Sequence, residues 1–169
     1  KRLELLKSKG IIAFADKFEK IYNLEEIRQF DLGKKIKTAG RIVLFREMGK
    51  ITFGHLQDFW GRIQVVFKED ILSKNNYDLF IKTIDIGDFI GIEGEIFKTK
   101  KGELSILVNK YTFLSKALMP LPEKWAGLKN IEIKYRKRYL DLITNEETRK
   151  RFLFRSKFIS ELRRFYENE

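Results

Sequence analysis

Short runs of alternating apolar and polar residues, separated by turns, fill the chain between residues 35 and 111. Alternation of this kind indicates β-strands with one buried face. It predicts five strands, at residues 35–46, 51–57, 62–69, 89–97 and 103–111. Glycine-bearing turns at 48–50 and 99–102 predict hairpins between the first and second strands and between the fourth and fifth.

A helix is predicted between the third and fourth strands, where apolar residues recur at helical spacing from Asn76 to Ile84. Five strands with a helix in this position are the order of elements in an OB-fold barrel. We therefore predict a mainly β protein, a five-stranded OB-fold barrel with N-terminal helices and a C-terminal helical extension. Other small barrels share the strand count, and the position of the helix favours the OB-fold among them.

Two helices are predicted ahead of the barrel. Residues 2–8 form the first, and Asn23 caps the second, with Glu26 at the capping-box position and Leu24, Ile27 and Phe30 on one side. This gives an N-terminal helical segment at 1–33 and an OB-fold domain at 34–115.

Prolines at 120 and 122 mark a linker at 116–128, and a helical pattern resumes at residues 129–169. One helical segment is predicted at about 133–142, and Asn145 caps another that has acidic residues in its first turn. This last helix carries an apolar stripe that requires a partner surface, formed by Phe154, Phe158, Leu162 and Phe165.

The composition narrows the chemistry. The 169 residues contain no cysteine and one histidine, which excludes a disulfide framework, a thiolate metal site and a cysteine nucleophile. No apolar run approaches the roughly 20 residues that span a membrane, so no membrane role is expected. The formal net charge of +11 favours a polyanionic partner, because each neutralised phosphate releases counterions. The alternative is a lysine-rich soluble protein without such a partner.

The second and third strands carry the most informative surface. If residues 58–61 form a four-residue loop, Gln57 lies opposite Arg62 and His55 lies opposite Gln64. Alternation then turns one set toward the barrel interior: Thr52, Gly54, Leu56, Ile63, Val65 and Phe67. The opposite set faces outward and mixes aromatic, amide and cationic side chains: Phe53, His55, Gln57, Arg62, Gln64, Val66 and Lys68.

Phe53 and Gln64, in the outward set, suit a single-stranded nucleic acid. An exposed phenyl ring is a stacking platform for a base, and a glutamine amide pairs with a base edge. Arg41 and Arg46, on the first strand, supply positive charge for phosphates. The plainer interpretation is that Phe53 covers the end of the barrel and that Gln64 is solvated.

Other candidates carry weaker signals. His55 by itself is best explained as a surface histidine. Glu93 and Glu103, on the fourth and fifth strands, match a hydrolytic carboxylate pair in type, but nothing else in the sequence supports hydrolysis, so surface charge is the default. The basic residues of 129–164 either contact RNA or form the solvated side of two helices.

A series of motifs then indicates a family. The barrel contains Gly40-Arg41, Arg46 with Met48-Gly49-Lys50, Phe53, Leu56-Gln57-Asp58 and Gly61-Arg62-Ile63-Gln64. In these motifs the chain resembles the anticodon-binding domain shared by lysyl-, aspartyl- and asparaginyl-tRNA synthetases. Further motifs resemble the class II lysyl-tRNA synthetases in particular: Gly87-Asp88, Gly91, Phe97-Lys98-Thr99-Lys100, Gly102-Glu103-Leu104-Ser105-Ile106, the residues from Lys116 to Lys124, Gly127-Leu128, Tyr135-Arg136 and the residues from Arg138 to Ile143.

The resemblance runs from about residue 3 to the end of the chain. Arg155-Ser156 and Phe165 match the approach to the family's first catalytic-domain motif, so residues 129–169 are expected to be the truncated start of a class II catalytic domain. Trp125-Ala126 departs from the family's usual Phe/Trp-His pair, which we expect to affect the packing of the linker and not base reading.

The resemblance also implies a role for each site residue. Phe53 stacks on an anticodon base and Gln64 reads that base, for which the central uridine is expected. Glu103 contacts the anticodon as well, and Arg46 and Arg41 lie near it. In addition, Glu93 matches a base-contacting glutamate of the aspartyl relatives, at a position where some lysine enzymes differ.

For the parent protein, the resemblance implies a lysine–tRNA ligase that uses ATP and Mg²⁺, works in the cytoplasm and forms a homodimer. The ATP- and lysine-binding motifs of the family lie beyond Glu169. We therefore expect this chain to bind the tRNA(Lys) anticodon stem-loop weakly, with no catalytic residue, metal or cofactor of its own. Three alternatives stay open: a general single-stranded nucleic-acid-binding OB-fold module, a protein-interaction barrel, and an aspartyl or asparaginyl identity, which the linker motifs disfavour.

Overall fold

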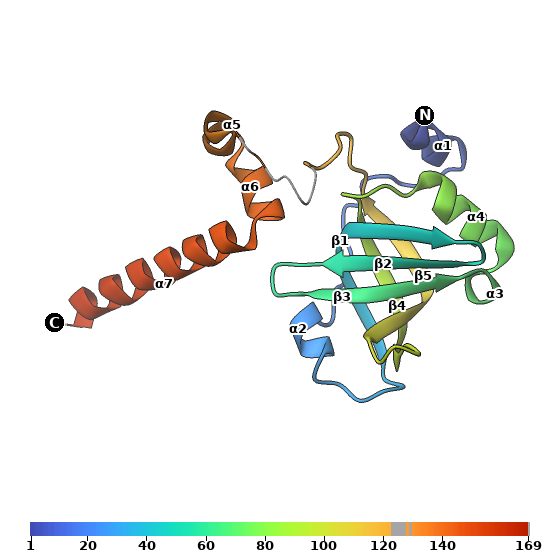
Figure 1. Ribbon diagram of the computed structural model, residues 1–169, viewed down its shortest axis with the longest axis horizontal. Helices are drawn as coiled ribbons and strands as arrows, with labels where there is room; N and C mark the ends of the chain where they lie inside the picture. Colours follow the sequence, from blue (N-terminus) through green and yellow to red (C-terminus); the bar gives the residue numbers. More distant parts are fainter. Residues whose placement is uncertain (123–127, 129, 169) are drawn as a thin grey trace. The chain divides into compact units, whose positions relative to one another are not determined.

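The computed structural model describes residues 1–122, 128 and 130–168, and it divides into two compact units, Lys1–Pro120 and Leu121–Glu169. The first unit is built on a closed barrel of five strands (Figure 1). Around the barrel the strands follow the order β1 (Lys35–Met48), β2 (Ile51–Gln57), β3 (Arg62–Lys68), β5 (Leu104–Ser115) and β4 (Phe89–Lys98). The predicted fold class, a five-stranded OB-fold barrel with helices at both ends of the chain, is confirmed.

The strand limits differ from the predicted ones mainly at β1 and β5. β1 runs two residues further than predicted, and β5 continues from 111 to Ser115, because β1 pairs with both β2 and β4 and β5 pairs with β4 over its whole length. A β-bulge between Ile42 and Leu44 bends β1, and the bent strand pairs with β2 along one part and with β4 along the other. A short parallel ladder between β3 and β5 closes the barrel.

The connection between β3 and β4 is helical, as predicted, and contains α3 (Glu69–Leu72) and α4 (Lys74–Thr83). The helix predicted from Asn76 therefore starts two residues earlier, and a separate short turn of helix precedes it. α4 buries Tyr77 and Phe80; the Phe80 ring stacks on Phe67 of β3 with centroids 4.1 Å apart, and the Tyr77 hydroxyl lies 2.7 Å from Thr52 Oγ1 of β2. These contacts extend the barrel core onto the helix.

The N-terminal segment contains α1 (Arg2–Ser8), as predicted, and α2 (Leu24–Ile27). The capping box is present: Glu26 N–H donates to Asn23 Oδ1 and Asn23 N–H donates to the Glu26 carboxylate, both at 2.8 Å. α2 ends at Ile27, so Phe30, predicted to share its repeat, lies beyond the helix and packs edge-on against Tyr22 at 4.9 Å.

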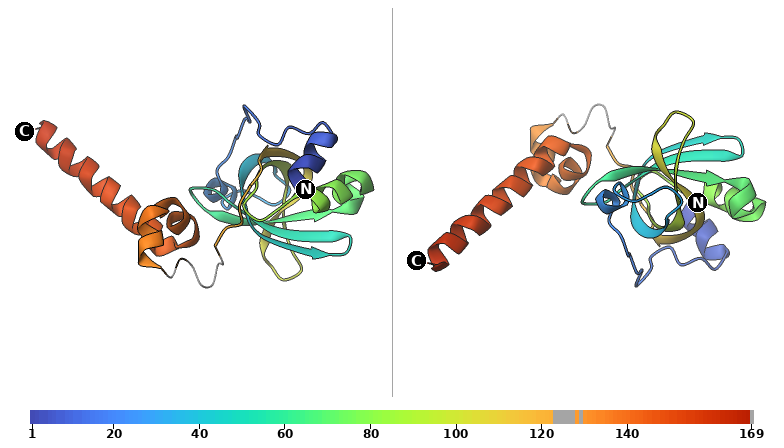
Figure 2. Two further views of the ribbon diagram at one scale, coloured as in Figure 1. Left: turned by 90° about the horizontal axis from the view of Figure 1, so that it is seen from above. Right: turned by 90° about the horizontal axis from the view of Figure 1, so that it is seen from below.

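Between these two helices, residues 11–22 run along the outside of the barrel, visible as the blue strand-free segment in Figure 2. Ala15 N–H donates to the Leu114 carbonyl at 2.9 Å, and Thr38 Oγ1 donates to the Tyr22 carbonyl at 2.7 Å. Phe18 covers Gly91 of β4 so closely that a Cβ at this glycine would lie within 2.8 Å of Phe18 Cδ2. The segment therefore covers the exterior of β4 and β1.

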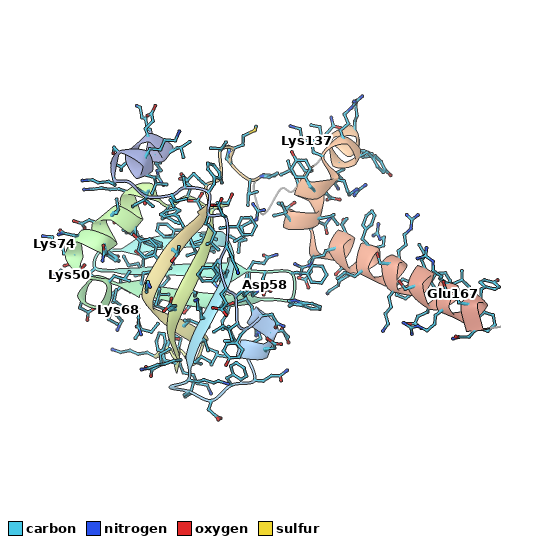
Figure 3. All side chains as sticks on the ribbon, turned by 180° about the vertical axis from the view of Figure 1, so that it is seen from behind. Lys50, Asp58, Lys68, Lys74, Lys137 and Glu167 are labelled. Carbon is cyan, nitrogen blue, oxygen red and sulfur yellow. The ribbon has the colours of Figure 1, made fainter. Side chains whose placement is uncertain are left out.

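Asp58, at the start of the β2–β3 loop, ties this segment to the barrel. Its carboxylate accepts hydrogen bonds from Lys20 Nζ at 2.6 Å, from Leu24 N–H at 2.9 Å, and from Trp60 N–H and Gly61 N–H at 2.8 Å each. The side chain is only 7% exposed. Figure 3 places it at the end of the barrel opposite Lys50 and Lys68. Burial by itself would raise the pKa of Asp58, but these hydrogen bonds and the charge of Lys20 outweigh it and lower the pKa below its ordinary value of 3.8.

This lowered pKa makes part of the stability depend on pH. Because the unfolded chain takes up the proton at a higher pH than the folded protein, Asp58 stabilises the fold above pH about 4 and loses this contribution as the pH falls through its folded pKa. We predict that Asp58→Asn lowers the free energy of unfolding at pH 7 and that the gap to wild type narrows in acid. Urea unfolding at pH 7, 5, 4 and 3 measures this gap. The control Asp16→Asn removes an exposed carboxylate and leaves the four bonds intact; an unchanging gap for Asp58→Asn would contradict the prediction.

Lys116, the first residue after β5, is buried in an ion pair at the end of the barrel. Its Nζ donates to Asp88 Oδ2 and to Asp85 Oδ2, both at 2.7 Å, and its side chain is 3% exposed while that of Asp88 is fully buried. Asp88 also accepts hydrogen bonds from Asp85 N–H and Ala117 N–H, at 2.7 Å each. Two of the motifs that carry the family resemblance, at 87–88 and at 116–124, thus meet in one contact that fixes where the chain leaves the barrel.

The second unit consists of α5 (Ile131–Arg136), α6 (Arg138–Thr144) and α7 (Glu146–Asn168). The helical segment predicted at 133–142 is divided, because Lys137, with φ −117° and ψ 51°, leaves the helical conformation between α5 and α6. Asn145 caps α7 as predicted and accepts from Thr148 N–H at 3.2 Å. Phe154, Phe158, Leu162 and Phe165 are exposed along α7.

Trp125-Ala126, where the sequence departs from the family pattern, lies outside the described residues, as does most of the predicted linker beyond residue 122. None of the helices in the described part of the chain is long and apolar enough to cross a membrane.

Candidate nucleic-acid interface

The β2–β3 hairpin has the predicted register. Residues 58–61 form the loop, closed by a hydrogen bond from Asp58 N–H to the Gly61 carbonyl at 3.0 Å. His55 lies opposite Gln64 and Gln57 opposite Arg62. All six residues predicted to face inward are buried: Thr52, Gly54, Leu56, Ile63, Val65 and Phe67. Because the side chains of a strand alternate between faces, this register turns Phe53 and Gln64 to the outside.

Phe53 and Gln64 are both partly exposed on the outer surface. Val66, predicted to share that surface, is instead only 2% exposed. The reason is its position between two large neighbours, since its partners across the sheet are Phe53 on β2 and Leu107 on β5. Val66 is therefore no part of the accessible outer surface.

Two rows of residues cross the outer face of the sheet. The first row contains Arg46, Phe53, Val66 and Leu107, from β1, β2, β3 and β5 in turn. The second row contains Leu44, His55, Gln64 and Ser105 from the same strands. Phe53 and Gln64 are therefore diagonal neighbours, close enough for a base stacked on the ring to meet the amide. Arg46 is exposed directly beside Phe53.

Hydrogen bonds and one close contact from His55 join the polar residues of the second row to Glu103; His55, Gln64, Ser105 and Glu103 are called the polar row below. Gln64 Nε2 donates to Glu103 Oε2 at 2.8 Å, and Ser105 Oγ donates to Gln64 Oε1 at 2.8 Å. His55 Nε2 lies 3.5 Å from the other carboxylate oxygen of Glu103. Ser105 is fully buried, whereas the Glu103 side chain is 51% exposed. The polar row is therefore buried at Ser105 and accessible to a ligand at Glu103.

Arg41 lies apart from this group. Its partners across the sheet are Gln57 of β2 and Phe89 of β4, so it is four residues along β2 from Phe53, or about 13 Å at the usual rise per residue. Its guanidinium lies over the Phe89 ring, 4.2 Å from the centroid, and donates to the Gly87 carbonyl at 3.2 Å. Burial lowers the pKa of Arg41. Its contacts are those of a residue that holds strand ends together.

Glu93 is also distant from Phe53. It lies on β4, which pairs with β1 and β5 and not with β2 or β3 in the barrel. Its partners across the sheet are Lys37 and Lys110, and its carboxylate lies 3.8 Å from Lys110 Nζ. Of the six residues singled out in the sequence, the structure thus brings together Phe53, Gln64, Glu103 and Arg46, and it places Arg41 and Glu93 elsewhere on the barrel.

Sequence reasoning missed two members of the polar row. In the sequence Ser105 is only part of a family motif, and the pattern around His55 predicts a plain surface histidine. Ser105 reaches Gln64 through the parallel β3–β5 ladder, for which local alternation carries no signal. For His55, the predicted position opposite Gln64 was already a hint. In the described ranges, no three His, Asp or Glu side chains gather in a way that suits a metal ion.

Basic residues also lie beyond Phe53 at one end of the barrel. Lys68 is the partner of Ile51 across the sheet, and the Lys50 carbonyl accepts from Glu69 N–H at 3.0 Å, so both lysines lie near the β1–β2 turn. Figure 3 shows them together with Lys74 at this end. Together with Arg46 they supply cationic side chains at this end, where the carboxylates of Glu47, Glu69 and Asp78 also lie near Tyr77.

Comparison with known protein families identifies the class of domain to which the barrel is similar. Residues 36–114, which make up almost the whole barrel, match the tRNA anti-codon family, described as an OB-fold nucleic acid binding domain. The barrel is therefore a nucleic-acid-binding OB-fold domain of the anticodon-binding type.

Relatives over the whole chain are more specific. The lysine–tRNA ligase of Aquifex aeolicus (strain VF5) is 45% identical over 150 residues, which are 88% of this chain and 25% of the relative. The lysine–tRNA ligases of Streptococcus suis (strain 05ZYH33) and Lactococcus lactis subsp. cremoris (strain MG1363) are 49% and 47% identical, each covering 97% of this chain and 35% of the relative. The chain thus matches the N-terminal portion of these lysine–tRNA ligases and spans about a quarter to a third of their length. The resemblance inferred from the motifs is confirmed.

Proposed function

We propose that the outer face of β2, β3 and β5 binds the anticodon loop of tRNA(Lys) and that Phe53 and Gln64 recognise one of its bases. The observation that carries the proposal is the diagonal placement of a partly exposed ring and a hydrogen-bonded amide on one face. The ring accepts any base by stacking, and the amide selects among bases by donor and acceptor position. The preferred base is the central uridine.

Glu103 and Arg46 complete this site in the proposal. Glu103 lies beside Gln64, and half of its side chain is accessible. We propose that its carboxylate contacts the edge of the stacked base or of an adjacent anticodon base. Arg46, beside the ring, contacts a phosphate, and Lys50 and Lys68 continue the path of the backbone past the β1–β2 turn. We propose that Arg41 and Glu93 lie at the margin of this site, because the Arg41 guanidinium lies over Phe89 and the Glu93 carboxylate lies 3.8 Å from Lys110.

The function of the parent protein follows from the relatives. We propose a lysine–tRNA ligase that joins lysine to tRNA(Lys) in an ATP- and Mg²⁺-dependent reaction, in the cytoplasm and as a homodimer. In that protein residues 34–115 supply recognition of the anticodon, and residues 129–169 open the class II catalytic domain. The described residues of this chain contribute RNA binding and no catalytic group.

Truncation of the stacking ring tests the proposal. Phe53→Ala is predicted to weaken binding of a tRNA(Lys) anticodon stem-loop by about 1–3 kcal/mol, or about 5- to 150-fold, through the loss of one stacked base. Fluorescence anisotropy with a labelled stem-loop measures the affinity, and thermal unfolding verifies that the variant is folded. Phe59→Ala is the matched control, because Phe59 is an exposed phenylalanine in the β2–β3 loop, outside the two rows. Equal binding by wild type and Phe53→Ala would reject Phe53 as the platform.

An RNA stem-loop with a scrambled loop sequence distinguishes anticodon recognition from general binding of single-stranded nucleic acid. A general single-strand binder on the same barrel loses affinity steeply with salt but binds the lysine loop and a scrambled loop alike. Anticodon recognition predicts that the lysine loop binds more tightly at every salt concentration. A protein-interaction barrel would show no salt-sensitive RNA binding.

A further inference from the structure

Glutamine is an ambiguous base reader when its amide is free to turn. The carbonyl oxygen accepts and the NH₂ group donates, and a half-turn about the last side-chain bond exchanges the two positions. Uracil and cytosine differ in the same way: uracil carries a carbonyl at C4 beside N3–H, and cytosine carries an amino group at C4 beside a bare N3. A freely turning amide therefore pairs with either pyrimidine, whereas an amide held in one orientation pairs with one of them in a given pose.

The amide of Gln64 is held from both sides. Its Nε2 donates to Glu103 Oε2, and its Oε1 accepts from Ser105 Oγ, both at 2.8 Å. A half-turn would bring Oε1 against a carboxylate oxygen, so that two acceptors face each other and the bond to Glu103 is lost. Ser105 Oγ would then accept from Nε2 and turn its hydrogen to the Glu103 backbone carbonyl at the longer distance of 3.2 Å. The Glu103 carboxylate therefore selects the orientation, and the Ser105 hydroxyl reinforces it.

Ser105 is well placed for this task. It is fully buried in β5 directly opposite Gln64 of β3. Its single hydroxyl hydrogen has two acceptors within reach, Gln64 Oε1 at 2.8 Å and the Glu103 backbone carbonyl at 3.2 Å, and the shorter distance favours Gln64. On the other side, His55 Nε2 lies 3.5 Å from the Glu103 oxygen that Gln64 does not use.

We propose that Ser105 and Glu103 clamp the Gln64 amide in one orientation and that Ser105 is thereby a positioning residue for base selectivity. The clamp uses one hydrogen of Nε2 and one lone pair of Oε1. The remaining hydrogen and lone pair face the ligand and pair with a base that presents a carbonyl beside an N–H. This inference rests on the proposed function, which makes that base uracil, and it assigns the rejection of cytosine to Glu103 and Ser105 acting together on the amide.

Binding of two stem-loops that differ only in the base stacked on Phe53, uracil or cytosine, tests the clamp. Wild type is expected to prefer the uracil loop by about tenfold or more, the usual discrimination of a two-bond contact. Ser105→Ala removes one of the two bonds that hold the amide and leaves the bond to Glu103 in place, so we expect uracil binding within about twofold of wild type, tighter cytosine binding, and a preference below that of wild type. Ser105→Thr keeps the hydroxyl and retains the wild-type preference. Ser115→Ala, the same change at the far end of β5, is the matched control and leaves the preference unchanged.

A second measurement does not depend on RNA. Relaxation of the Gln64 side-chain ¹⁵N reports how freely the amide moves on the picosecond-to-nanosecond scale. Its order parameter is expected to fall in Ser105→Ala and to stay at the wild-type value in Ser115→Ala, and this comparison decides the matter if Ser105→Thr does not fold. An equal order parameter in wild type and Ser105→Ala would overturn the clamp.

The outcomes separate the two proposals. If neither loop binds, or if Phe53→Ala binds like wild type, the proposed anticodon site itself fails. If binding depends on Phe53 while wild type prefers neither pyrimidine, or while Ser105→Ala keeps the full preference, the site stands and the clamp is wrong.

Discussion

Replacing Lys116 with methionine is predicted to lower the free energy of unfolding by about 3–5 kcal/mol. Methionine has a similar length and no charge, so the change removes the cation and little packing volume. The fully buried Asp88 carboxylate then keeps its hydrogen bonds from Asp85 N–H and Ala117 N–H but loses its only buried cation among the described residues. An uncompensated charge away from water costs more than a lost surface contact, because neither solvent nor salt screens it.

Urea unfolding of the barrel followed by tryptophan fluorescence measures this loss. Lys110→Met is the matched control: Lys110 is 69% exposed and lies 3.8 Å from Glu93, a surface ion pair of the kind that contributes less than about 1 kcal/mol. The double variant Lys116→Met with Asp88→Asn removes both charges and is expected to recover part of the lost stability. A loss for Lys116→Met no larger than that for Lys110→Met would show that the buried pair does not hold the end of the barrel.

The part of the site that the sequence predicts is the part set by alternation along neighbouring strands. Slipping β3 against β2 by one residue would turn Gln64 inward and expose Ile63, Val65 and Phe67. The apolar pattern therefore selects one pairing, and a loop of four residues between Gln57 and Arg62 is consistent with it. From this pairing alone, the diagonal position of the ring and the amide follows.

What the sequence does not predict depends on contacts between distant residues or on irregular backbone. Gln64 and Ser105 are 41 positions apart and meet only because the barrel closes through a parallel ladder. Arg41 and Arg46 are an odd number of positions apart, so strict alternation would put them on opposite faces. The bulge at 42–44 adds one residue and turns both outward, and Phe89 then draws the Arg41 guanidinium away from the site.

The burial of Lys116 and the fate of Glu93 show the same limit. Both residues belong to a strongly charged sequence, and nothing in their local pattern separates an exposed charge from a buried one. Lys116 becomes buried because its neighbours in space are two aspartates from the loop before β4, and Glu93 stays at the surface because lysines flank it on both neighbouring strands. The role of each charge is set by which strands the closed barrel places next to each other.

A change on β4 tests how that closure positions β5. Gly94→Ala is predicted to lower the free energy of unfolding by about 3 kcal/mol or more, at the upper end for overpacking. A Cβ at Gly94 would lie 2.8 Å from Ile106 Cγ2 and closer still to the backbone carbonyl oxygen of Leu107. Backbone in a paired strand has little freedom to move, so the strain is relieved only by displacing β5 from β4. Ile106 and Leu107 directly follow Ser105, and a displaced β5 therefore also moves the serine that holds the Gln64 amide.

Gly91→Ala, three residues earlier on the same strand, is the comparison that isolates this effect. A Cβ there meets the side chain of Phe18, with Cδ2 at 2.8 Å and Cε2 and Cζ closer still, and that ring belongs to a covering segment outside the sheet. Because a side chain gives way more easily than paired backbone, we expect a loss of about 1–2 kcal/mol for Gly91→Ala. The base preference should fall in Gly94→Ala, measured well below its lowered unfolding midpoint, and stay at the wild-type value in Gly91→Ala. A larger loss of stability at Gly91 than at Gly94 would mean that the covering segment, and not the close approach of β4 to β5, sets the position of the fifth strand.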